Sequence, residues 1–222
     1  YHKKHRKEKI KMLENIEVLC HSSIRFSKKK IIYFDPFKIE ENYNDADVIF
    51  ITHDHYDHYS EEDIDKVVKG DTIIVVPEDL KTKLLKKEWK EENIITVRPN
   101  ESYTAKNIEF KTIPAYNVNK QFHPKENAWV GYLLEIEGIT YYIAGDTDMT
   151  EENKKVKCDV AFVPVGGTYT MDYQEAAELI NEIRPEIAVP THYGSIVGER
   201  EDGIKFLKLV NPEIKVEILM KK

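Results

Sequence analysis

The chain has 222 residues, and 33 lysine and arginine residues against 40 aspartate and glutamate residues give it a net charge of −7. Leu, Ile, Val and Phe together exceed a quarter of the chain, which excludes a disordered polyelectrolyte and indicates a folded protein with a substantial core. The acidic balance argues against nucleic-acid binding through bulk positive charge. Isoleucine and valine far outnumber leucine, and these β-branched residues favour sheet.

Short apolar runs bounded by polar or turn residues open the chain and predict strands. We expect a meander of strands at residues 16–20, 23–26, 30–34 and 47–52. Ser60 can cap a helix that ends at Gly70, because Asp63 stands three residues after the serine. The pattern then predicts a strand at 72–76, a helix at 77–87 and a strand at 94–97.

The second part of the chain mixes hairpins with alternating strands and helices. Residues 101–113 predict two strands, and residues 130–143 predict a hairpin that turns near Glu137 and Gly138. We expect later strands at 160–165, 187–190 and 214–219, and helices at 172–183 and 197–210. This mixture fits helices that cover the outer faces of two packed sheets, within one domain that spans residues 12–222.

Residues 1–11 differ in composition from the rest, and we expect them to be an expression remnant or a disordered basic arm. His2 and His5 are therefore left out of any site. No run approaches 18 apolar residues, and no apolar signal-peptide region precedes the first predicted strand, so we expect a cytoplasmic protein without a membrane partner. Cys20 and Cys158 lie in apolar runs and are expected to be free thiols.

Three histidines and two aspartates fall within six residues, in the run His53-Asp54-His55-Tyr56-Asp57-His58. The run directly follows a predicted strand, which would place it on a loop at the edge of a sheet. Imidazole and carboxylate groups crowded in this way are the ligands of Zn²⁺ and related cations. A solvated polar loop is the alternative, but the chain has only eight histidines, and three within six residues are more than chance gives. The run therefore predicts a metal site.

Together with Thr52, this run resembles the THxHxDH signature of the metallo-β-lactamase superfamily. Later and earlier segments resemble other motifs of that family in the right order, each after a predicted strand: Asp35-Pro36-Phe37, Ala144-Gly145-Asp146-Thr147 and Pro190-Thr191-His192-Tyr193-Gly194. The resemblance covers about residues 15–219. The segments at residues 19–23, 123–124, 129–132 and 165–172 resemble the short, single-domain branch that includes the ascorbate-6-phosphate lactonase-like proteins. The resemblance implies an α/β fold, a four-layer αββα sandwich with metals at one end between the sheets.

The resemblance also implies a set of site residues. His53 and His55 would belong to a first metal site, Asp57, His58 and His192 to a second, and Asp146 would bridge the two metals. Asp57 is also a catalytic candidate. Asp54 is not a ligand in the family pattern, and we expect it to orient a histidine or assist proton transfer. The turn Gly166-Gly167-Thr168 is expected to hold an anionic substrate group with its backbone N–H groups.

One departure concerns the third histidine of the first site, because the chain reads Pro114-Ala115-Tyr116-Asn117 where the family has that histidine. His123 is either a ligand or substrate contact, or else a loop residue. Asn117 is a further candidate contact, and His21 is either a neighbour of the site or a structural histidine. With only two histidines assigned, we expect the first site to bind its metal more weakly than the second.

The resemblance implies a metal-dependent hydrolase in which one or two Zn²⁺ ions supply a metal-bound hydroxide at neutral pH. The same ligands admit Mn²⁺, Ni²⁺ or iron. We expect the substrate to be an ester, lactone or phosphodiester of a small, anionic metabolite. The alternatives are a nuclease acting on RNA or DNA and a non-catalytic metal-binding protein. The negative charge and the lack of room for a nucleic-acid-clamping domain disfavour the nuclease.

Overall fold

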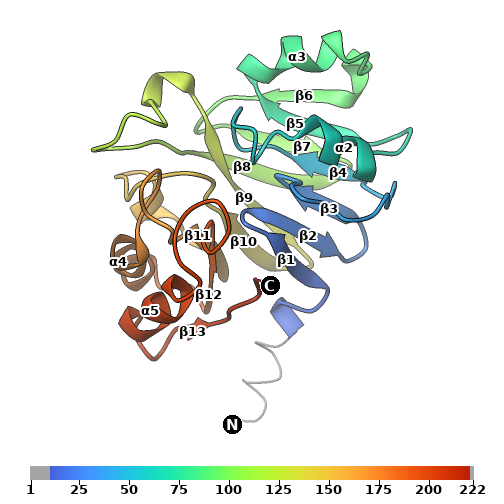
Figure 1. Cartoon of the computed structure of the whole chain (residues 1–222). Helices are drawn as coiled ribbons and strands as arrows, with labels where there is room; N and C mark the ends of the chain where they lie inside the picture. Colours follow the sequence, from blue (N-terminus) through green and yellow to red (C-terminus); the bar gives the residue numbers. More distant parts are fainter. Residues whose placement is uncertain (1–10, 221–222) are drawn as a thin grey trace.

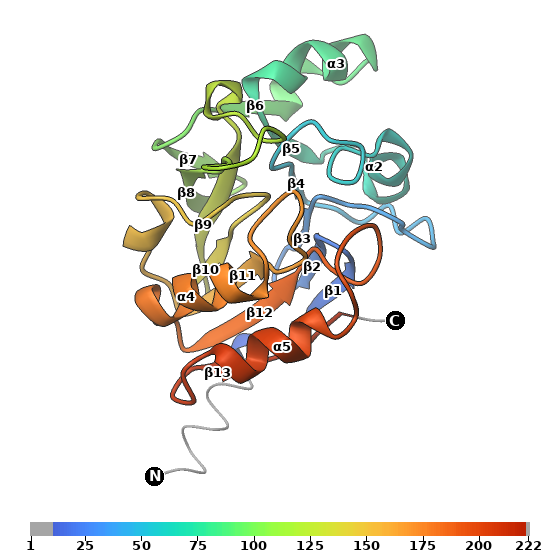
Figure 2. The ribbon, with the colours of Figure 1, turned by 60° about the vertical axis from the view of Figure 1, so that its left-hand side comes forward.

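The structure, a computed structural model, describes residues 11–220 and consists of two β-sheets packed face to face. Helices cover the outer face of each sheet (Figure 1). The view in Figure 2 shows α4 and α5 lying against the second sheet. The predicted four-layer αββα sandwich is therefore confirmed. The expectation for residues 1–11 falls, except for Lys11, outside the described residues.

The first sheet has six strands, which lie side by side in chain order. They are β1 (Ile16–Cys20), β2 (Ser23–Ser27), β3 (Ile31–Phe34), β4 (Val48–Phe50), β5 (Ile73–Pro77) and β6 (Ile94–Val97). The first three are antiparallel, but β4 runs parallel to β3, and β5 and β6 continue in parallel. The predicted meander was thus wrong for its fourth strand, because the chain after β3 crosses back before it enters β4.

The second sheet has seven strands in the order β13-β12-β11-β10-β9-β8-β7. They are β7 (Ser102–Ala105), β8 (Ile108–Pro114), β9 (Val130–Ile136), β10 (Ile139–Ile143), β11 (Val160–Pro164), β12 (Ile187–Thr191) and β13 (Lys215–Val216). The strands from β7 to β10 are antiparallel, and those from β10 to β13 are parallel. Only two residues of the strand expected at 214–219 pair with β12, although Met220 forms a bridge with Val18.

Within residues 13–220, the α-helices are α2 (Glu61–Val67), α3 (Lys81–Lys86), α4 (Tyr173–Ile183) and α5 (Asp202–Leu209). Ser60 caps α2 as predicted, and Asp172 with Glu175 forms a capping box at α4. The helix expected at 77–87 divides into the 3₁₀ turn η1 (Glu78–Leu80) and α3. The helix expected from residue 197 starts at Asp202, because Gly198 has a φ of +68° and the Asp202 side chain accepts a hydrogen bond from Glu199 N.

Three apolar layers hold the sandwich together. Between the sheets, aromatic rings from both sheets pack in contact, with Phe34 and Phe50 stacked at 5.0 Å and Tyr132 edge-on to Phe50 at 4.9 Å. The outer face of the first sheet packs against α2 and α3 through Ile64 and Leu84, among others. The outer face of the second sheet packs against α4 and α5. Two well-filled sheets thus form a rigid support for the loops at their ends.

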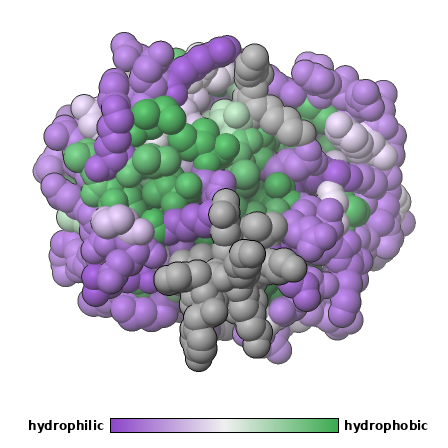
Figure 3. Space-filling model, turned by 90° about the horizontal axis from the view of Figure 1, so that it is seen from below, coloured by the Kyte–Doolittle hydropathy of each residue, from purple (hydrophilic) through white to green (hydrophobic). Residues whose placement is uncertain are grey.

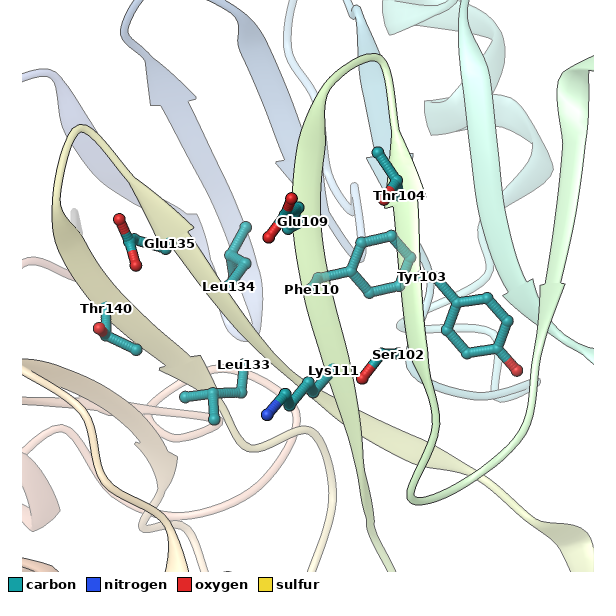
Figure 4. A pocket seen from close by; sticks show the side chains of 10 residues that line it. All are labelled: Ser102, Tyr103, Thr104, Glu109, Phe110, Lys111, Leu133, Leu134, Glu135 and Thr140. Carbon is teal, nitrogen blue, oxygen red and sulfur yellow. The ribbon is translucent and has the colours of Figure 1, made fainter.

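Two other surfaces lie away from these loops. Hydrophobic residues gather on the face seen from below in Figure 3, the side on which α5 lies in Figure 1. An open pocket of about 540 Å³ lies on β7 to β10 (Figure 4), lined by Lys111, Leu133 and Glu135 among others, and no histidine or aspartate lines it. Within residues 11–220, no helix is both long enough and apolar enough to cross a membrane.

Candidate metal centre

Strands from both sheets end at one edge of the sandwich, and the predicted site residues follow them. His21 comes after β1, Asp35 after β3 and His53 three residues after the end of β4. In the second sheet, Asp146 follows β10 and His192 follows β12. All five strands run in the same direction within their sheets. Because the carboxyl ends of parallel strands meet at one edge, side chains that are far apart in sequence come together there.

The first group of donor atoms consists of His53, His55 and His123, whose ligand atoms lie within 4.8 Å of one another. His53 Nε2 and His55 Nδ1 are 3.1 Å apart. The ring of Trp129 packs against all three imidazoles, with centroid distances of 5.0, 5.0 and 5.7 Å. His123 therefore occupies the place of the histidine that is missing near Asn117, so the structure offers three nitrogen donors where the sequence assigned two.

The second group consists of His21, Asp57, His58 and His192, again with ligand atoms within 4.8 Å of one another. Asp57 Oδ2 is 3.2 Å from His21 Nε2, 3.5 Å from His58 Nε2 and 3.8 Å from His192 Nε2. The His21 and His192 rings lie 3.8 Å apart. Of the two interpretations of His21, the structure therefore favours a residue of the site.

The carboxylate of Asp146 lies between the two groups. Its Oδ2 is 2.9 Å from His192 Nε2, 3.3 Å from His123 Nε2 and 3.8 Å from His53 Nε2. Its Oδ1 is 3.3 Å from His58 Nε2. One carboxylate thus faces ring nitrogens of both groups, which is the arrangement expected of a bridging ligand.

Many donor atoms at this edge lack hydrogen-bond partners, as expected for atoms that bind a cation. Among residues 11–220, the buried side-chain polar atoms without a hydrogen-bond partner include the following: both ring nitrogens of His21 and of His192, Nε2 of His58 and of His123, and Oδ1 of Asp146. Several approach a neighbour within 2.9 to 3.3 Å without the alignment of a hydrogen bond. Buried polar atoms are almost always paired, so their convergence on common points is the signature of a metal centre.

Protonation states suit this interpretation. Burial lowers the pKa of His21 to about 4 and lowers the pKa of His53 well below its usual value, so both rings are neutral at pH 7. Burial would raise the pKa of Asp146, but the rings of His192 and His58 outweigh it and hold this pKa well below its usual value. Neutral imidazoles and an ionised carboxylate are the forms that bind metals.

His58 differs from the other rings because two carboxylates flank it. Burial alone would lower its pKa, but Asp146 and Asp35 outweigh burial and raise the pKa well above its usual value. Asp35 Oδ2 is 2.7 Å from His58 Nδ1 and accepts a hydrogen bond from Thr52 Oγ1 at 2.7 Å. An Asp35 carboxylate that accepts from Nδ1–H leaves Nε2 as the atom that faces the site.

Three sequence-based assignments need correction or refinement. Both oxygens of Asp54 accept hydrogen bonds from Lys83 Nζ at the surface, and within residues 11–220 no hydrogen bond or ion pair joins Asp54 to a site histidine. Asn117 bonds to His123, with Oδ1 accepting from His123 N at 2.9 Å, and its side chain faces that histidine. In the turn at Gly166, the N–H group of Gly167 donates to Met171 O at 3.0 Å within the loop, so this one of the turn's N–H groups is not free for an anion.

The glycine at position 166 instead permits a close approach. A Cβ atom there would lie 2.1 Å from the carbonyl oxygen of His192, well inside contact distance. The turn after β11 therefore packs directly on the backbone that carries His192. The first of the two adjacent glycines after the buried strand therefore has a packing role.

A two-sheet sandwich with histidine and aspartate donors for two cations at its edge defines a protein of the metallo-hydrolase type. Residues 15–192 match the beta-lactamase superfamily domain, and the chain belongs to this superfamily. A UPF0173 metal-dependent hydrolase from Thermoplasma acidophilum is 30% identical over 210 residues, which cover 89% of this chain and 92% of that protein. Another, from Saccharolobus solfataricus, is 31% identical over 191 residues, which cover 79% of this chain and 78% of that protein.

Solved structures agree with this assignment. A protein from Parabacteroides distasonis is 31% identical and superposes with a TM-score of 0.75, over 92% of this chain and 91% of that chain. Igni18, a metallo hydrolase from Ignicoccus hospitalis, has the same fold with a TM-score of 0.74 and 22% identity, over 92% of this chain and 94% of that chain.

Proposed function

We propose that this metal-dependent hydrolase cleaves an ester, lactone or phosphodiester bond in a small, anionic metabolite. The observation that carries the proposal is the convergence of buried, unpartnered nitrogen and oxygen atoms around Asp146. Hydrolysis of such bonds is the chemistry that paired cations with histidine and carboxylate ligands support. An acidic, compact chain also suits a small substrate better than a nucleic acid.

One cation would be held by His53, His55 and His123, the other by His21, Asp57, His58 and His192, with Asp146 between them. Zn²⁺ is the cation that this nitrogen-rich set favours, and Mn²⁺, Ni²⁺ and iron are the other candidates. When bound, the cations lower the pKa of coordinated water toward 7 and polarise the bond under attack.

The chain's own residues supply proton handling and orientation. Burial would raise the pKa of Asp57, but the rings of His21 and His58 outweigh it and lower this pKa, so the carboxylate is ionised at neutral pH. A carboxylate with a lowered pKa is a weak base, so Asp57 would orient the attacking water as a hydrogen-bond acceptor and would take up its proton only after the cations have acidified that water. Lys38 donates a hydrogen bond to Ser195, three residues beyond His192, and places a positive charge on the loop that follows His192. That charge supports an anionic substrate.

A substrate panel with matched variants tests the proposal. Protein loaded with Zn²⁺ or Mn²⁺ is incubated with an aryl ester, a γ-lactone, bis(p-nitrophenyl) phosphate and an RNA oligonucleotide, alongside Asp57→Asn and the surface control Asp54→Asn. We expect hydrolysis of at least one small substrate by the wild type and by Asp54→Asn, and a loss of at least about 100-fold in Asp57→Asn. Cleavage of RNA alone would favour the nuclease, and no cleavage by either loaded form would favour a metal-binding protein without catalysis.

A further inference from the structure

The segment that carries His123 runs from the end of β8 to the start of β9 and is exposed at its tip. Val118 is 56% and Phe122 47% exposed, yet His123 is 1% exposed and Asn117 is 8% exposed. Ring packing holds part of this loop, because His123 lies against Trp129 and Phe122 lies edge-on to Tyr169 at 4.6 Å. Polar contacts of Asn117 and of Asp148, two residues beyond Asp146, add a second and more directional constraint.

Asn117 connects His123 to the rest of the protein. Its Oδ1 accepts from His123 N at 2.9 Å and lies 3.2 Å from His123 Nδ1, while its Nδ2 donates to Tyr169 O at 2.8 Å and to Asp148 Oδ1 at 3.2 Å. Because both neighbours of Nδ2 are acceptors, the amide has one orientation. An amide oxygen only accepts, so His123 Nδ1 carries its proton and Nε2 keeps its lone pair for the site.

Asp148 holds the same loop at several points. Its carboxylate is 3% exposed and accepts hydrogen bonds from Val118 N at 2.8 Å and Lys120 Nζ at 2.6 Å, besides the one from Asn117. Lys120 offsets the buried negative charge. Asp148 N also donates to Tyr116 O at 3.0 Å, so backbone and side chain bind one loop.

Asp146 and Asp148 belong to one short segment after β10, and this links two parts of the site. Asp146 faces both groups of histidines, and its Oδ2 is 3.3 Å from His123 Nε2. Asp148 sets where the His123 loop lies relative to that same segment. The segment Asp146–Asp148 therefore both carries the bridging carboxylate and fixes the loop of His123, so it determines the distance between Asp146 Oδ2 and His123 Nε2.

We infer that Asn117 and Asp148 are positioning residues that hold His123 as the third nitrogen donor of the first metal site. This pair replaces a histidine at the end of β8 with one supplied six residues later. The inference rests on the metal centre of the proposed function and does not depend on which bond is hydrolysed. The first site should therefore not be the weak site that the sequence predicted, provided that the pair is intact.

Metal titration by calorimetry, with Co²⁺ absorption spectra as a second readout, tests the pair. In Asp148→Asn, the amide N–H either faces the N–H of Val118 or takes the place of the oxygen that accepts from Lys120, so one hydrogen bond is lost. In Asn117→Asp, a carboxylate oxygen faces two acceptors, Asp148 Oδ1 and Tyr169 O. Each change should weaken one of the two sites by about 10- to 100-fold and leave the other within about twofold. His123→Ala should weaken the same site, with the same loss of Co²⁺ absorption.

A rescue variant and a control sharpen the test. In Asn117→Asp combined with Asp148→Asn, the hydrogen bond between the two side chains can reform with its direction reversed, so binding should recover at least threefold over Asn117→Asp. Glu152→Gln is the control, because Glu152 holds the outer side of the loop through Tyr116 Oη at 2.7 Å and Lys125 Nζ at 2.8 Å. It should leave both sites within about twofold.

The outcomes separate this inference from the proposed function. Equal weakening of both sites, unchanged binding in both single variants, or a Glu152→Gln effect as large as theirs would each overturn the positioning role. If Asp148→Asn does not fold, Asn117→Asp and Asn117→Ala decide alone, with far-ultraviolet circular dichroism as the check on folding. A protein that binds two metals as described but hydrolyses nothing would sink the proposed function and leave the inference standing.

Discussion

Replacing Asp35 with asparagine should reduce the number of protons that the protein releases when it binds a metal ion. Asp35 is 1% exposed, and its carboxylate accepts hydrogen bonds from Thr52 N at 2.8 Å and Thr52 Oγ1 at 2.7 Å. The same carboxylate lies 2.7 Å from His58 Nδ1 and, with Asp146, raises the pKa of His58 well above its usual value. The two carboxylates therefore favour the protonated form of the His58 ring in the metal-free protein, and a metal must displace that proton.

The magnitude follows from the linkage between protons and metal. The wild type should release about one proton from His58 at pH 8, and its apparent metal affinity should rise about tenfold per pH unit while the pH stays below the pKa of His58. In Asp35→Asn a negative charge beside the ring is lost, so the pKa of His58 falls and the release falls by up to about one proton. The mismatched amide should also lower the free energy of unfolding by about 1 to 3 kcal/mol.

Calorimetric titration with Mn²⁺ at pH 8.0, in two buffers with different ionisation enthalpies, counts the released protons. Protons lost from coordinated water are released equally by the wild type and by Asp35→Asn. The difference between their proton counts therefore reports the proton released from His58. Asp45→Asn is the control, because Asp45 accepts hydrogen bonds from Arg25 and Tyr33 and is not among the metal-site donors. An equal proton count for wild type and Asp35→Asn would refute the reasoning.

Four further predictions concern the ligands, a thiol and a glycine. His58→Ala and His192→Ala should each remove one metal and most hydrolysis, measured by elemental analysis and initial rates, and unchanged metal content in both would contradict the assignment. Asp146→Ala and Asp146→Asn should weaken both metals in a calorimetric titration, and two metals bound with wild-type affinity in either would show that Asp146 is not the bridge. Burial raises the pKa of Cys158 to about 12, so roughly one thiol in 10,000 is ionised at pH 8, and iodoacetamide should label it only after unfolding, with rapid labelling of the native protein as the contrary result. Gly166→Ala should lower the free energy of unfolding, measured in urea, by more than about 2 kcal/mol, because the new Cβ would meet His192 O. Gly70→Ala is the control, because Gly70 lies in open space, and it should change this free energy by less than about 1 kcal/mol. Equal losses in the two variants would contradict the prediction.

Local patterns predicted the elements well where short-range physics decides them. The strands at Ile16–Cys20 and Ile94–Val97 coincide with their apolar runs. Ser60 and Asp172 mark helix starts, because their side chains accept from backbone N–H groups of the first turn. The direction of β4 was not predicted, since an apolar run shows that a strand forms but not which neighbour it pairs with or in which direction.

Local sequence indicated some of the candidate metal ligands and could not indicate others. His53, His55 and His58 share one loop with Asp57, so their spacing already indicated a site. His123 could not be assigned, because its position depends on the hydrogen bond that its N–H donates to Asn117 Oδ1 and on the loop contacts of Asp148, which no local pattern contains. The position of Asp54 within the run suggested a role beside a histidine, but local sequence could not show that Asp54 pairs with Lys83, 29 residues later.

Three residues at this edge have a backbone conformation that residue preferences do not predict. His21, Asp35 and His192 have φ values of +55°, +44° and +57°, in the left-handed region that non-glycine residues rarely adopt. Each such residue costs about 1 to 3 kcal/mol and persists only where its surroundings compensate. Here the neighbouring backbone does so, because His192 N donates to His21 O at 3.1 Å and Asp35 N donates to Phe50 O at 2.9 Å. Glycine at these three positions would relieve the strain but remove a donor atom from the centre or the support of His58, so stability and metal binding place opposite demands on the same residues.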